Sequence, residues 1–318
     1  MNYLAITLLL IILSRIYITI AKKYGILDIP NHRSSHQKVT IRGGGILFFL
    51  SQICFFIGSD FAYWPFFLGL TLLAVISFLD DIITLKALIR FLVQFIAVAL
   101  LLFYIDLDIA IFFTAILMVG AIAFLNAFNF MDGINGITGV YSIVVLLVYL
   151  YINTIKETFV INEVITYTLI SVVIFGYYNF RKRALFFAGD VGSITMAFIL
   201  LFLSLRFLDT YNSIVFLGFF SVYGADTLLT ILKRIRLREK ISEPHRHHIY
   251  QKLVDVYEWS HMKVAIVYGL LQLISSFIIV NVMDAAYNLQ LVVLVCILLI
   301  MAILYVSVDT YAKRKVRV

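Results

Sequence analysis

Residues 109–139 read IAIFFTAILMVGAIAFLNAFNFMDGINGITG. The first part, residues 109–128, is almost wholly apolar and is long enough to cross about 30 Å of hydrocarbon as an α-helix. The part from Asn126 onward gathers asparagine, aspartate and glycine in a chain that is otherwise mostly hydrocarbon. Such groups at the end of a membrane-spanning helix are costly unless they meet a polar ligand. The stretch therefore predicts both a membrane fold and a site.

The composition of the chain supports a membrane protein. Of its 318 residues, 63% are hydrophobic and only 14% are charged, which excludes an ordinary soluble domain. Cys54 and Cys296 both fall in apolar segments, which excludes a disulfide framework and a cysteine metal site. We expect one all-α integral membrane domain over residues 1–318. Its eleven or so transmembrane helices are predicted at residues 2–21, 44–58, 64–79, 88–105, 109–128, 137–153, 164–180, 191–207, 213–232, 263–282 and 288–308.

The distribution of basic residues predicts how these helices are oriented. Of the 25 Lys and Arg residues, 22 lie in or beside loops that this topology puts on one side, and only Arg15, Lys156 and Arg206 lie elsewhere. By the positive-inside rule that side is the cytoplasm, which puts the N-terminus outside and the C-terminus in the cytoplasm. The net charge of +7 is explained by this anchoring role and requires no nucleic acid.

Five polar clusters lie in these loops, each just before an even-numbered helix. Helix N-termini present free N–H groups and the positive end of the helix dipole, both of which favour phosphate. The loops therefore predict an anion-binding site on one membrane face. In chain order the clusters are DIPNHRSSHQKVTIRGGG (28–45), Asp80-Asp81, DGING (132–136), GDVGS (189–193) and HRHH (245–248).

Three aspartates of these clusters are candidates for chemistry. Asp80 and Asp81 suit a metal-bound phosphate or the removal of a proton from an acceptor, although they could equally end their helix in solvent. Asp190, beside glycine and serine at a helix start, suits Mg²⁺ bound jointly with a diphosphate because Mg²⁺ takes few protein ligands. The alternative is that Asp190 only caps the helix.

The central stretch offers a second set of polar groups. Asn126 and Asn129 are three residues apart and share a helical face, while Asp132 and Asn135 project from the loop that follows. An Asn-Gly turn that closes one helix and caps the next is the structural alternative. Because such a turn needs only about two residues of this kind, the number of polar groups favours a site.

The histidine cluster has several interpretations. His245, His247 and His248 lack a Cys or further His at a spacing typical of zinc. With Arg246 they suit phosphate binding or proton handling, or else they form a solvated loop. Asp226, inside a predicted helix, either faces the site or is hydrogen-bonded within the bundle.

Taken together, these clusters resemble the polyprenyl-phosphate N-acetylhexosamine-1-phosphate transferase superfamily, glycosyltransferase family 4. The NFMDG, RSSH and HRHHIYQ segments are most similar to its branch that initiates O-antigen and capsule synthesis. The family usually has DGIDG where this chain has Asn135, and prolines where it has Val39 and Ile41. Five motifs in the family's order carry the resemblance: LDIPNHRSSHQKVTIRGGG, LDDIITLKALIRFLVQ, NAFNFMDGINGITG, FFAGDVGS and EPHRHHIYQKL.

The resemblance implies an enzyme that moves a sugar 1-phosphate from a UDP-N-acetylhexosamine to a polyprenyl phosphate such as undecaprenyl phosphate, and that releases UMP. This step would initiate a lipid-linked cell-surface glycan of the cell wall or of lipopolysaccharide. The implied cofactor is Mg²⁺, with Mn²⁺ as a substitute. The implied location is the bacterial inner membrane, with many passes through the bilayer and the active site on the cytoplasmic face. A homodimer is left open.

The resemblance also implies roles for individual residues. Asp80 or Asp81 would serve the lipid phosphate, and Phe187 would lie against the uracil ring. The implied catalytic residues are Asp80, Asp81, Asp132, Asp190 and His248. The implied metal ligands are Asp190 and Asn129. The implied substrate-binding residues are Asn31, Arg33, His36, Arg42, Gly43, Gly44, Asn126, Asn135, Phe187, Gly189, Ser193, His245, Arg246 and His247.

Two other functions fit a polytopic membrane protein. A transporter or lipid flippase could also have eleven spans, but transporters tend to bind their substrates near the bilayer midplane, whereas these polar clusters gather at one face. A scaffold could dock a cytoplasmic partner on its polar loops, but this leaves the Gly-Asp loops without a purpose. The sequence therefore favours the enzyme.

Overall fold

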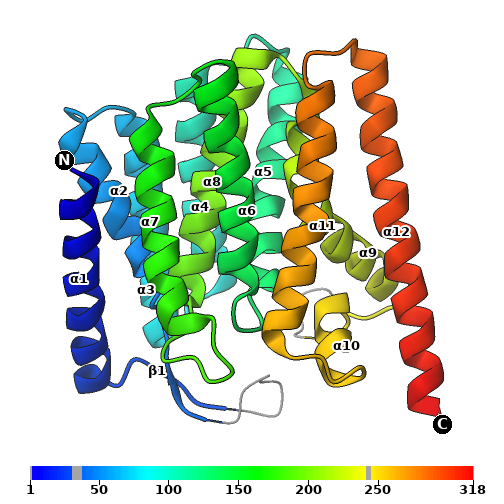
Figure 1. Cartoon of the computed structure of the whole chain (residues 1–318), viewed down its shortest axis with the longest axis horizontal. Helices are drawn as coiled ribbons and strands as arrows, with labels where there is room; N and C mark the ends of the chain where they lie inside the picture. The colour runs from blue at the N-terminus through cyan, green and yellow to red at the C-terminus, as the bar shows by residue number, and fades with distance from the viewer. Residues whose placement is uncertain (1, 31–37, 241–244, 318) are drawn as a thin grey trace.

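The computed structural model describes residues 2–30, 38–240 and 245–317. These residues form a bundle of helices with one small β-hairpin (Figure 1), which confirms the all-α prediction. The helices are α1 (Tyr3–Tyr24), α2 (Ile46–Gly58), α3 (Trp64–Ile83), α4 (Ala87–Ile105), α5 (Ile111–Met131), α6 (Ile137–Tyr151), the π-helical η1 (Ile152–Lys156), α7 (Asn162–Asn179), α8 (Gly189–Tyr211), the 3₁₀-helical η2 (Ile214–Phe220), α9 (Ser221–Arg236), α10 (Ile249–Asp255), α11 (His261–Val282) and α12 (Tyr287–Arg317). The hairpin pairs β1 (Leu27–Asp28) with β2 (Thr40–Ile41).

The predicted apolar stretches all coincide with helices. In the described part of the chain, nine helical segments are long and apolar enough to cross a membrane. Helix α2 is shorter, with 13 residues, and α7 begins with the polar residues Asn162 and Glu163. The protein is thus a multi-pass helical membrane protein, while the number of eleven spans stays a prediction.

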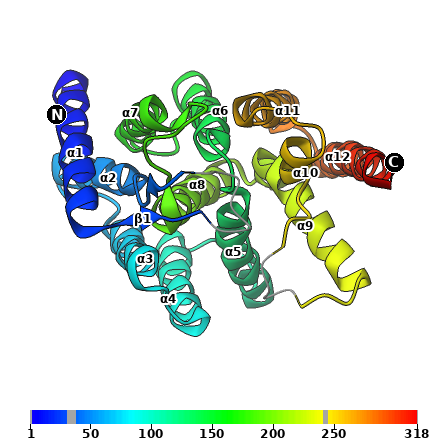
Figure 2. The ribbon, with the colours of Figure 1, turned by 90° about the horizontal axis from the view of Figure 1, so that it is seen from below.

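Helix α8 lies in the middle of the bundle when the molecule is seen from below (Figure 2). Each of its residues from Val191 to Leu205 is buried. A helix that is buried on all sides needs neighbours all round it, and α2, α3, α5 and α6 pack against α8. This packing fixes the N-terminus of α8, which carries Asp190, near the centre of one end of the molecule.

The two ends of the chain lie at opposite ends of the bundle. In Figure 1, α1 starts in the upper part and runs downward, whereas α12 ends at the lower right, at the same end of the bundle as β1 and α10. This arrangement agrees with termini on opposite sides of a membrane. Which end faces the cytoplasm stays a prediction.

The region from residue 213 to residue 263 is more elaborate than one span and one loop. The predicted span at 213–232 is divided into η2 and α9, and α9 leans outward from the bundle (Figure 2). The following loop contains the short helix α10, which the sequence analysis did not predict. Its first turn is closed by Gln251, whose side chain accepts a hydrogen bond from the His248 N–H at 3.3 Å.

The start of α2 and the start of α8 are held together by their backbones. The N–H groups of Gly44 and Gly45 donate to the carbonyls of Phe187 and Ala188 at 2.8 and 3.0 Å. A Cβ at Gly45 would lie 2.3 Å from the Cα of Gly192. Only glycine therefore permits this approach, which joins the first predicted cluster to the fourth.

We expect a Gly45→Ala substitution to destabilise the protein, by about 1–3 kcal/mol for overpacking, because the atoms it meets are backbone atoms. Unfolding can be followed through the buried thiol of Cys54 in a Cys296→Ser background, with a thiol-reactive dye. Gly120→Ala is the matched control, because a Cβ there meets nothing within 4 Å. Equal melting temperatures for the two variants would contradict the close contact.

Candidate active site

Hydrogen bonds join the first, second and fourth predicted clusters directly at the lower end of the bundle in Figure 1. Residues that flank the third cluster bond to Ser193 of the fourth cluster and to Tyr250, which follows the fifth. The convergence that the topology predicted is thus present in the fold. The contacts that establish it are Arg42 Nη2 to Asp190 (3.2 Å), the Asp190 N–H to Asp81 (2.9 Å), Asn135 Nδ2 to the Arg181 carbonyl (2.9 Å) and the Tyr250 hydroxyl to the Phe130 carbonyl (3.0 Å).

Asp81 anchors the N-terminus of α8. Its carboxylate accepts the N–H groups of Asp190 and Val191 at 2.9 and 3.1 Å, so it caps that helix from α3. It also pairs with Arg42 Nε at 2.6 Å, and its side chain is fully buried. Because its oxygens already have these partners, Asp81 is placed to hold the site together.

Asp190 lies between two arginines. One of its oxygens is 3.2 Å from Arg42 Nη2 and the other is 3.6 Å from Arg90 Nη1. The side chain is 18% exposed, whereas that of Asp81 is completely covered. Asp190 is therefore the aspartate of this group that a ligand can reach most easily.

Asp80 completes the ionic cluster. It pairs with Arg90 Nη1 at 2.8 Å and accepts the Leu85 N–H, which fixes the turn between α3 and α4. Within the described residues, the ion-pair partners of Asp80, Asp81 and Asp190 are Arg42 and Arg90. Three carboxyl groups thus share two guanidinium groups, which gives these five groups a formal charge of −1. An unbalanced carboxylate in a half-buried cluster favours a cation, and the two guanidinium groups favour a phosphate.

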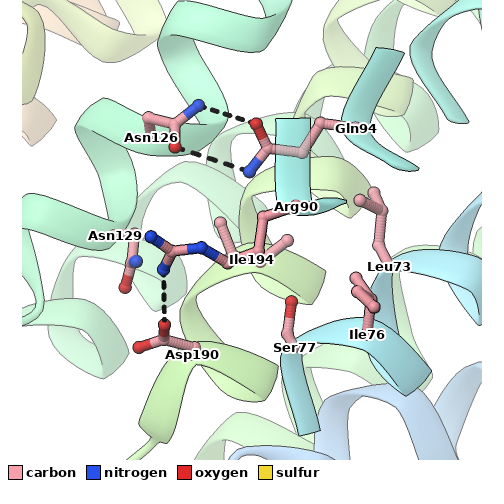
Figure 3. A pocket seen from close by; sticks show the side chains of 9 residues that line it. All are labelled: Leu73, Ile76, Ser77, Arg90, Gln94, Asn126, Asn129, Asp190 and Ile194. Carbon is pink, nitrogen blue, oxygen red and sulfur yellow. Dashed lines mark hydrogen bonds and ion pairs between the residues drawn. The ribbon is translucent and has the colours of Figure 1, made fainter. Parts of the chain in front are cut away.

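A pocket opens beside this cluster, between α3, α4, α5 and α8 (Figure 3). In the close-up, Arg90 crosses the middle of the pocket with Asp190 below it, while aliphatic side chains form the opposite wall. The pocket thus combines an ionic group with a hydrocarbon surface. Its lining residues are Leu73, Ile76, Ser77, Arg90, Gln94, Asn126, Asn129, Asp190 and Ile194.

The two asparagines of α5 have different surroundings in this pocket. Asn126 forms a pair with Gln94 of α4, with Nδ2 of Asn126 donating to Oε1 of Gln94 at 2.8 Å (Figure 3). Asn129 accepts the Ser193 hydroxyl at 2.7 Å through Oδ1 and lies near Asp190 in the pocket wall. Ser193 itself is buried, so it acts on Asn129 and does not reach a ligand in this arrangement.

Asp132 lies in the loop after α5 and accepts a hydrogen bond from the Thr138 hydroxyl. Burial raises the pKa of its carboxyl to about 6, against the opposing effect of that hydrogen bond, and the negative charge of Asp81 contributes to the rise. The folded protein therefore binds this proton more tightly than the unfolded chain does. Stability is lost as the pH rises through the folded pKa.

We expect Asp132→Asn to stabilise the protein at neutral pH. Its advantage over the wild type should be absent below about pH 4, grow as the pH rises towards 6 and then level off at no more than about 3 kcal/mol. The measurement is the difference in melting temperature between the two proteins from about pH 4 to pH 8. A difference that does not change with pH would show that Asp132 has an ordinary pKa.

Asn135 holds the loop in place. Its Nδ2 donates to the Arg181 carbonyl, its N–H donates to His261 Nδ1 at 3.3 Å, and the residue is buried. The next N–H, that of Gly136, donates to Asn179 Oδ1 at 2.7 Å. The structure thus gives Asn135 a position that fastens the loop to the end of α7. Its contact with a nucleotide stays a prediction.

The glycines of the first and fourth clusters allow backbone conformations and close contacts that a larger residue would disturb. Gly43 and Gly189 have positive φ values, +77° and +72°, which favour glycine. A Cβ at Gly44 would overlap the ring of Phe186. Phe187 is partly exposed and its N–H is fixed to the Ile41 carbonyl at 2.8 Å, so its ring can form one edge of a ligand site.

The histidine cluster lies over α9. Arg246 binds Asp255 through two nitrogens, at 3.0 and 2.9 Å, and His247 Nε2 lies 3.0 Å from Glu239. The ring of His245 stacks on that of His247 and lies near that of His248, and burial, with repulsion from the neighbouring histidines and Arg234, lowers the pKa of His245 to about 4. His248 is buried against Asp226. This loop is therefore built from internal pairs, and no metal cluster of three such side chains occurs in the described ranges.

Asn31, Arg33 and His36, which were predicted to bind substrate, lie outside the described residues. The part of the first loop that is described, from Lys38 onward, reaches the site through Arg42. Binding of substrate by these three residues stays a prediction.

Comparison of the sequence with known proteins shows which family it resembles. The sequence model described as "Glycosyl transferase family 4" matches residues 63–208, which run from α3 into α8 and include Asp80, Asp132 and Asp190. The chain is therefore similar to glycosyl transferase family 4 over this region. A "probable undecaprenyl-phosphate N-acetylglucosaminyl 1-phosphate transferase" of Bacillus subtilis (strain 168) is 25% identical over 93% of this chain and 88% of its own length.

Two further relatives extend this similarity. An undecaprenyl-phosphate alpha-N-acetylglucosaminyl 1-phosphate transferase of Thermotoga maritima is 23% identical over 88% of this chain and 89% of its own length. A phospho-N-acetylmuramoyl-pentapeptide-transferase of Thermotoga neapolitana is 28% identical over 75% of this chain and 83% of its own length. The similarity therefore covers most of each protein.

The metal that the family resemblance implies fits the residues present. Mg²⁺ is usually bound through one or two carboxylates, with water and substrate phosphates completing its shell. Asp190 offers a reachable carboxylate, Asn129 offers an amide oxygen in the same pocket wall, and the cluster carries an uncompensated negative charge. A site with few protein oxygens and no histidine or cysteine suits this ion.

Sequence reasoning identified Arg90 only as a neighbour of the aspartate pair and missed Gln94. The structure puts both in the pocket, with Arg90 between two carboxylates. The sequence contains a feature that could have identified Gln94: it lies one helical turn after Arg90 in an otherwise apolar helix. Polar residues inside membrane helices are usually functional or paired.

Proposed function

We propose that this protein transfers a sugar 1-phosphate from a UDP-N-acetylhexosamine to a polyprenyl phosphate and releases UMP. The reaction would initiate a lipid-linked glycan of the cell surface, at the cytoplasmic face of a bacterial inner membrane. The observation that carries the proposal is the pocket of Figure 3, in which Arg90 and Asp190 lie against aliphatic side chains between membrane-spanning helices. The match to the family model and the names of the relatives support the same reaction class.

The pocket suits an acceptor that is both a phosphate and a hydrocarbon. Leu73, Ile76 and Ile194 provide an apolar surface, which a polyprenyl chain could contact without losing its lipid environment. Arg90, 39% exposed at its side chain, can turn from its carboxylate partners to the incoming phosphate. Asp80, which now holds Arg90, is then the carboxylate nearest to that phosphate.

The chemical step depends mainly on positioning and charge neutralisation, as phosphoryl transfer generally does. An oxygen of the polyprenyl phosphate attacks the β-phosphorus of the UDP-sugar, and the bond from that phosphorus to the bridging oxygen breaks. UMP leaves with the electron pair of that bond. Arg42 and Arg90 flank Asp190 on two sides, so they can hold the phosphate oxygens in line while negative charge moves from acceptor to leaving group.

Asp190 and Asn129 are the residues we propose to hold Mg²⁺. The ion would neutralise charge on the diphosphate. Asp81 contributes by fixing the first turn of α8, and Ser193 contributes by orienting the amide of Asn129. Direct attack by the lipid phosphate requires no covalent intermediate on an aspartate and is therefore the simpler course.

The function can be tested with the purified protein in detergent. It is incubated with undecaprenyl phosphate, Mg²⁺ and each of a panel of UDP-sugars, and UMP is measured. We expect UMP release with at least one UDP-N-acetylhexosamine, and none when the lipid or, after chelation, the metal is left out. UMP release that is independent of the lipid would indicate a hydrolase, and its absence with every N-acetylated sugar would refute the proposal.

A further inference from the structure

One buried carboxylate takes no part in the ionic cluster around Asp190. Asp226 lies on α9, is 4% exposed, and is surrounded by hydrogen-bond donors. It accepts the Tyr268 hydroxyl at 2.7 Å and the Ile249 N–H at 3.0 Å. It also lies 3.2 Å from Nδ1 of His248, the last histidine of the HRHH cluster. From the sequence, Asp226 either faces the site or is hydrogen-bonded inside the bundle. In the structure it is hydrogen-bonded to the histidine loop.

The hydrogen-bond donors around Asp226 determine whether its carboxylate or Nδ1 of His248 carries the proton in their contact. One oxygen accepts from the Ile249 N–H and the other from the Tyr268 hydroxyl. These donors stabilise the ionised carboxylate, which has no proton to offer to the His248 ring. The contact with Nδ1 is favourable only if Nδ1 itself is protonated, and a hydrogen bond of this kind to a carboxylate is about twice as strong as a neutral one.

The other ring nitrogen of His248, Nε2, is buried and has no hydrogen-bond partner among the residues that the structure describes. A buried polar atom without a partner costs about 1–3 kcal/mol, and such atoms call for a ligand or another explanation. With the proton on Nδ1, a neutral ring presents Nε2 as an acceptor, and a protonated ring presents it as a donor.

We propose that Asp226 is a positioning residue that holds the imidazole of His248 with its proton on Nδ1, so that Nε2 is kept for the nucleotide sugar. This inference rests on the proposed function for the identity of the ligand, but the position of the proton does not depend on it. Asp226 acts through His248 and through the first turn of α10, and it does not touch substrate.

A structural role for Asp226 is the competing interpretation. Asp226 accepts backbone N–H groups at the start of α10, so it also helps to cap that helix. In the capping box of α10, the His248 side chain accepts the Gln251 N–H, and since Nε2 has no partner in the described residues, Nδ1 is the nitrogen that this box involves. In this interpretation the proton is on Nε2, and an unprotonated Nδ1 faces a carboxylate oxygen at 3.2 Å.

Nitrogen-15 NMR of histidine-labelled protein in nanodiscs distinguishes the two arrangements. The His248 signals are assigned by their loss in His248→Gln. We expect the wild-type spectrum to show a protonated Nδ1 and a Nε2 resonance that shifts when UDP-N-acetylglucosamine is added. A protonated Nε2 in the neutral ring would overturn the assignment, and so would a Nε2 resonance that is unchanged while the substrate is bound. The first result stands whether or not the protein releases UMP.

Kinetics provide an independent test. We expect Asp226→Asn to lower kcat at least tenfold with a smaller change in KM, and the double variant Asp226→Asn/His248→Gln to be no slower than His248→Gln alone. The control is Gln251→Ala, which weakens the same turn of α10 without touching Asp226 and should keep kcat within about threefold of the wild type. If Gln251→Ala lowers kcat as much as Asp226→Asn does, Asp226 is only a cap.

Discussion

Asp190→Asn is expected to lower the rate of transfer by about 100- to 1000-fold, the usual effect of removing a charged group that stabilises a transition state. The reason lies in the pairing of this carboxylate with Arg42 and Arg90, at 3.2 and 3.6 Å. An amide keeps the shape of the side chain but removes the charge that orients both guanidinium groups and that would bind a cation. The measurement is the initial rate of UMP release at saturating Mg²⁺.

The control for Asp190→Asn lies on the same helix. Asp209, near the other end of α8, pairs with Arg206 at 2.7 Å and is remote from the site. Asp209→Asn should therefore keep the wild-type rate. Both variants should keep the wild-type melting temperature within a few degrees, which separates loss of chemistry from loss of fold. An Asp190→Asn enzyme with more than a tenth of the wild-type rate would contradict the assignment.

Asp81→Ala is expected to have the largest effect on stability. The substitution removes the fully buried partner of Arg42 and uncovers the N–H groups of Asp190 and Val191 at the start of α8. Breaking a buried ion pair from one side typically costs about 3–5 kcal/mol. We expect a large fall in melting temperature, measured through the Cys54 thiol, together with loss of activity because Asp190 is no longer fixed.

Asp80→Ala is the natural comparison, because it removes the neighbouring carboxylate. Its partner Arg90 is 39% exposed and can be solvated, so the expected loss of stability is only about 1–2 kcal/mol. Activity should fall nonetheless, and more through transfer than through binding of the UDP-sugar. If the two alanine variants melted at the same temperature, the separation of an anchoring Asp81 from a ligand-facing Asp80 would be wrong.

The sequence predicted the helices well, because the cost of exposing polar groups to hydrocarbon leaves a clear pattern of apolar stretches. It could not predict the division of the span at 213–232. The segment Ile214–Phe220 is apolar throughout, so hydropathy does not distinguish it from the helix that follows. It packs closely against α11 at Gly218, where a Cβ would lie 2.3 Å from Ile279 Cδ1. Helix α10 was missed for a similar reason, since its first turn is held by Asp226, more than twenty residues away.

The convergence of the five loops was predictable, because alternating helices return polar loops to one side of a membrane. The role of each side chain was not. Asp80 and Asp81 are adjacent in sequence, yet consecutive positions on a helix point in different directions, and only the packing of α3 against α8 turns Asp81 inward. Asn135 looked like a ligand-facing group, and its bond to the Arg181 carbonyl is a tertiary contact that no local pattern reveals.

The central claim is that the protein transfers a sugar together with its phosphate, and one labelling experiment tests it directly. The substrate is a UDP-N-acetylhexosamine that carries ³²P in the β-phosphate, supplied with undecaprenyl phosphate, and the products are separated into lipid and water phases. If the account is correct, the ³²P enters the lipid phase together with the sugar, and unlabelled UMP remains in the water. Sugar in the lipid phase with the ³²P left in the water as UDP would show transfer of the sugar alone, and would contradict it.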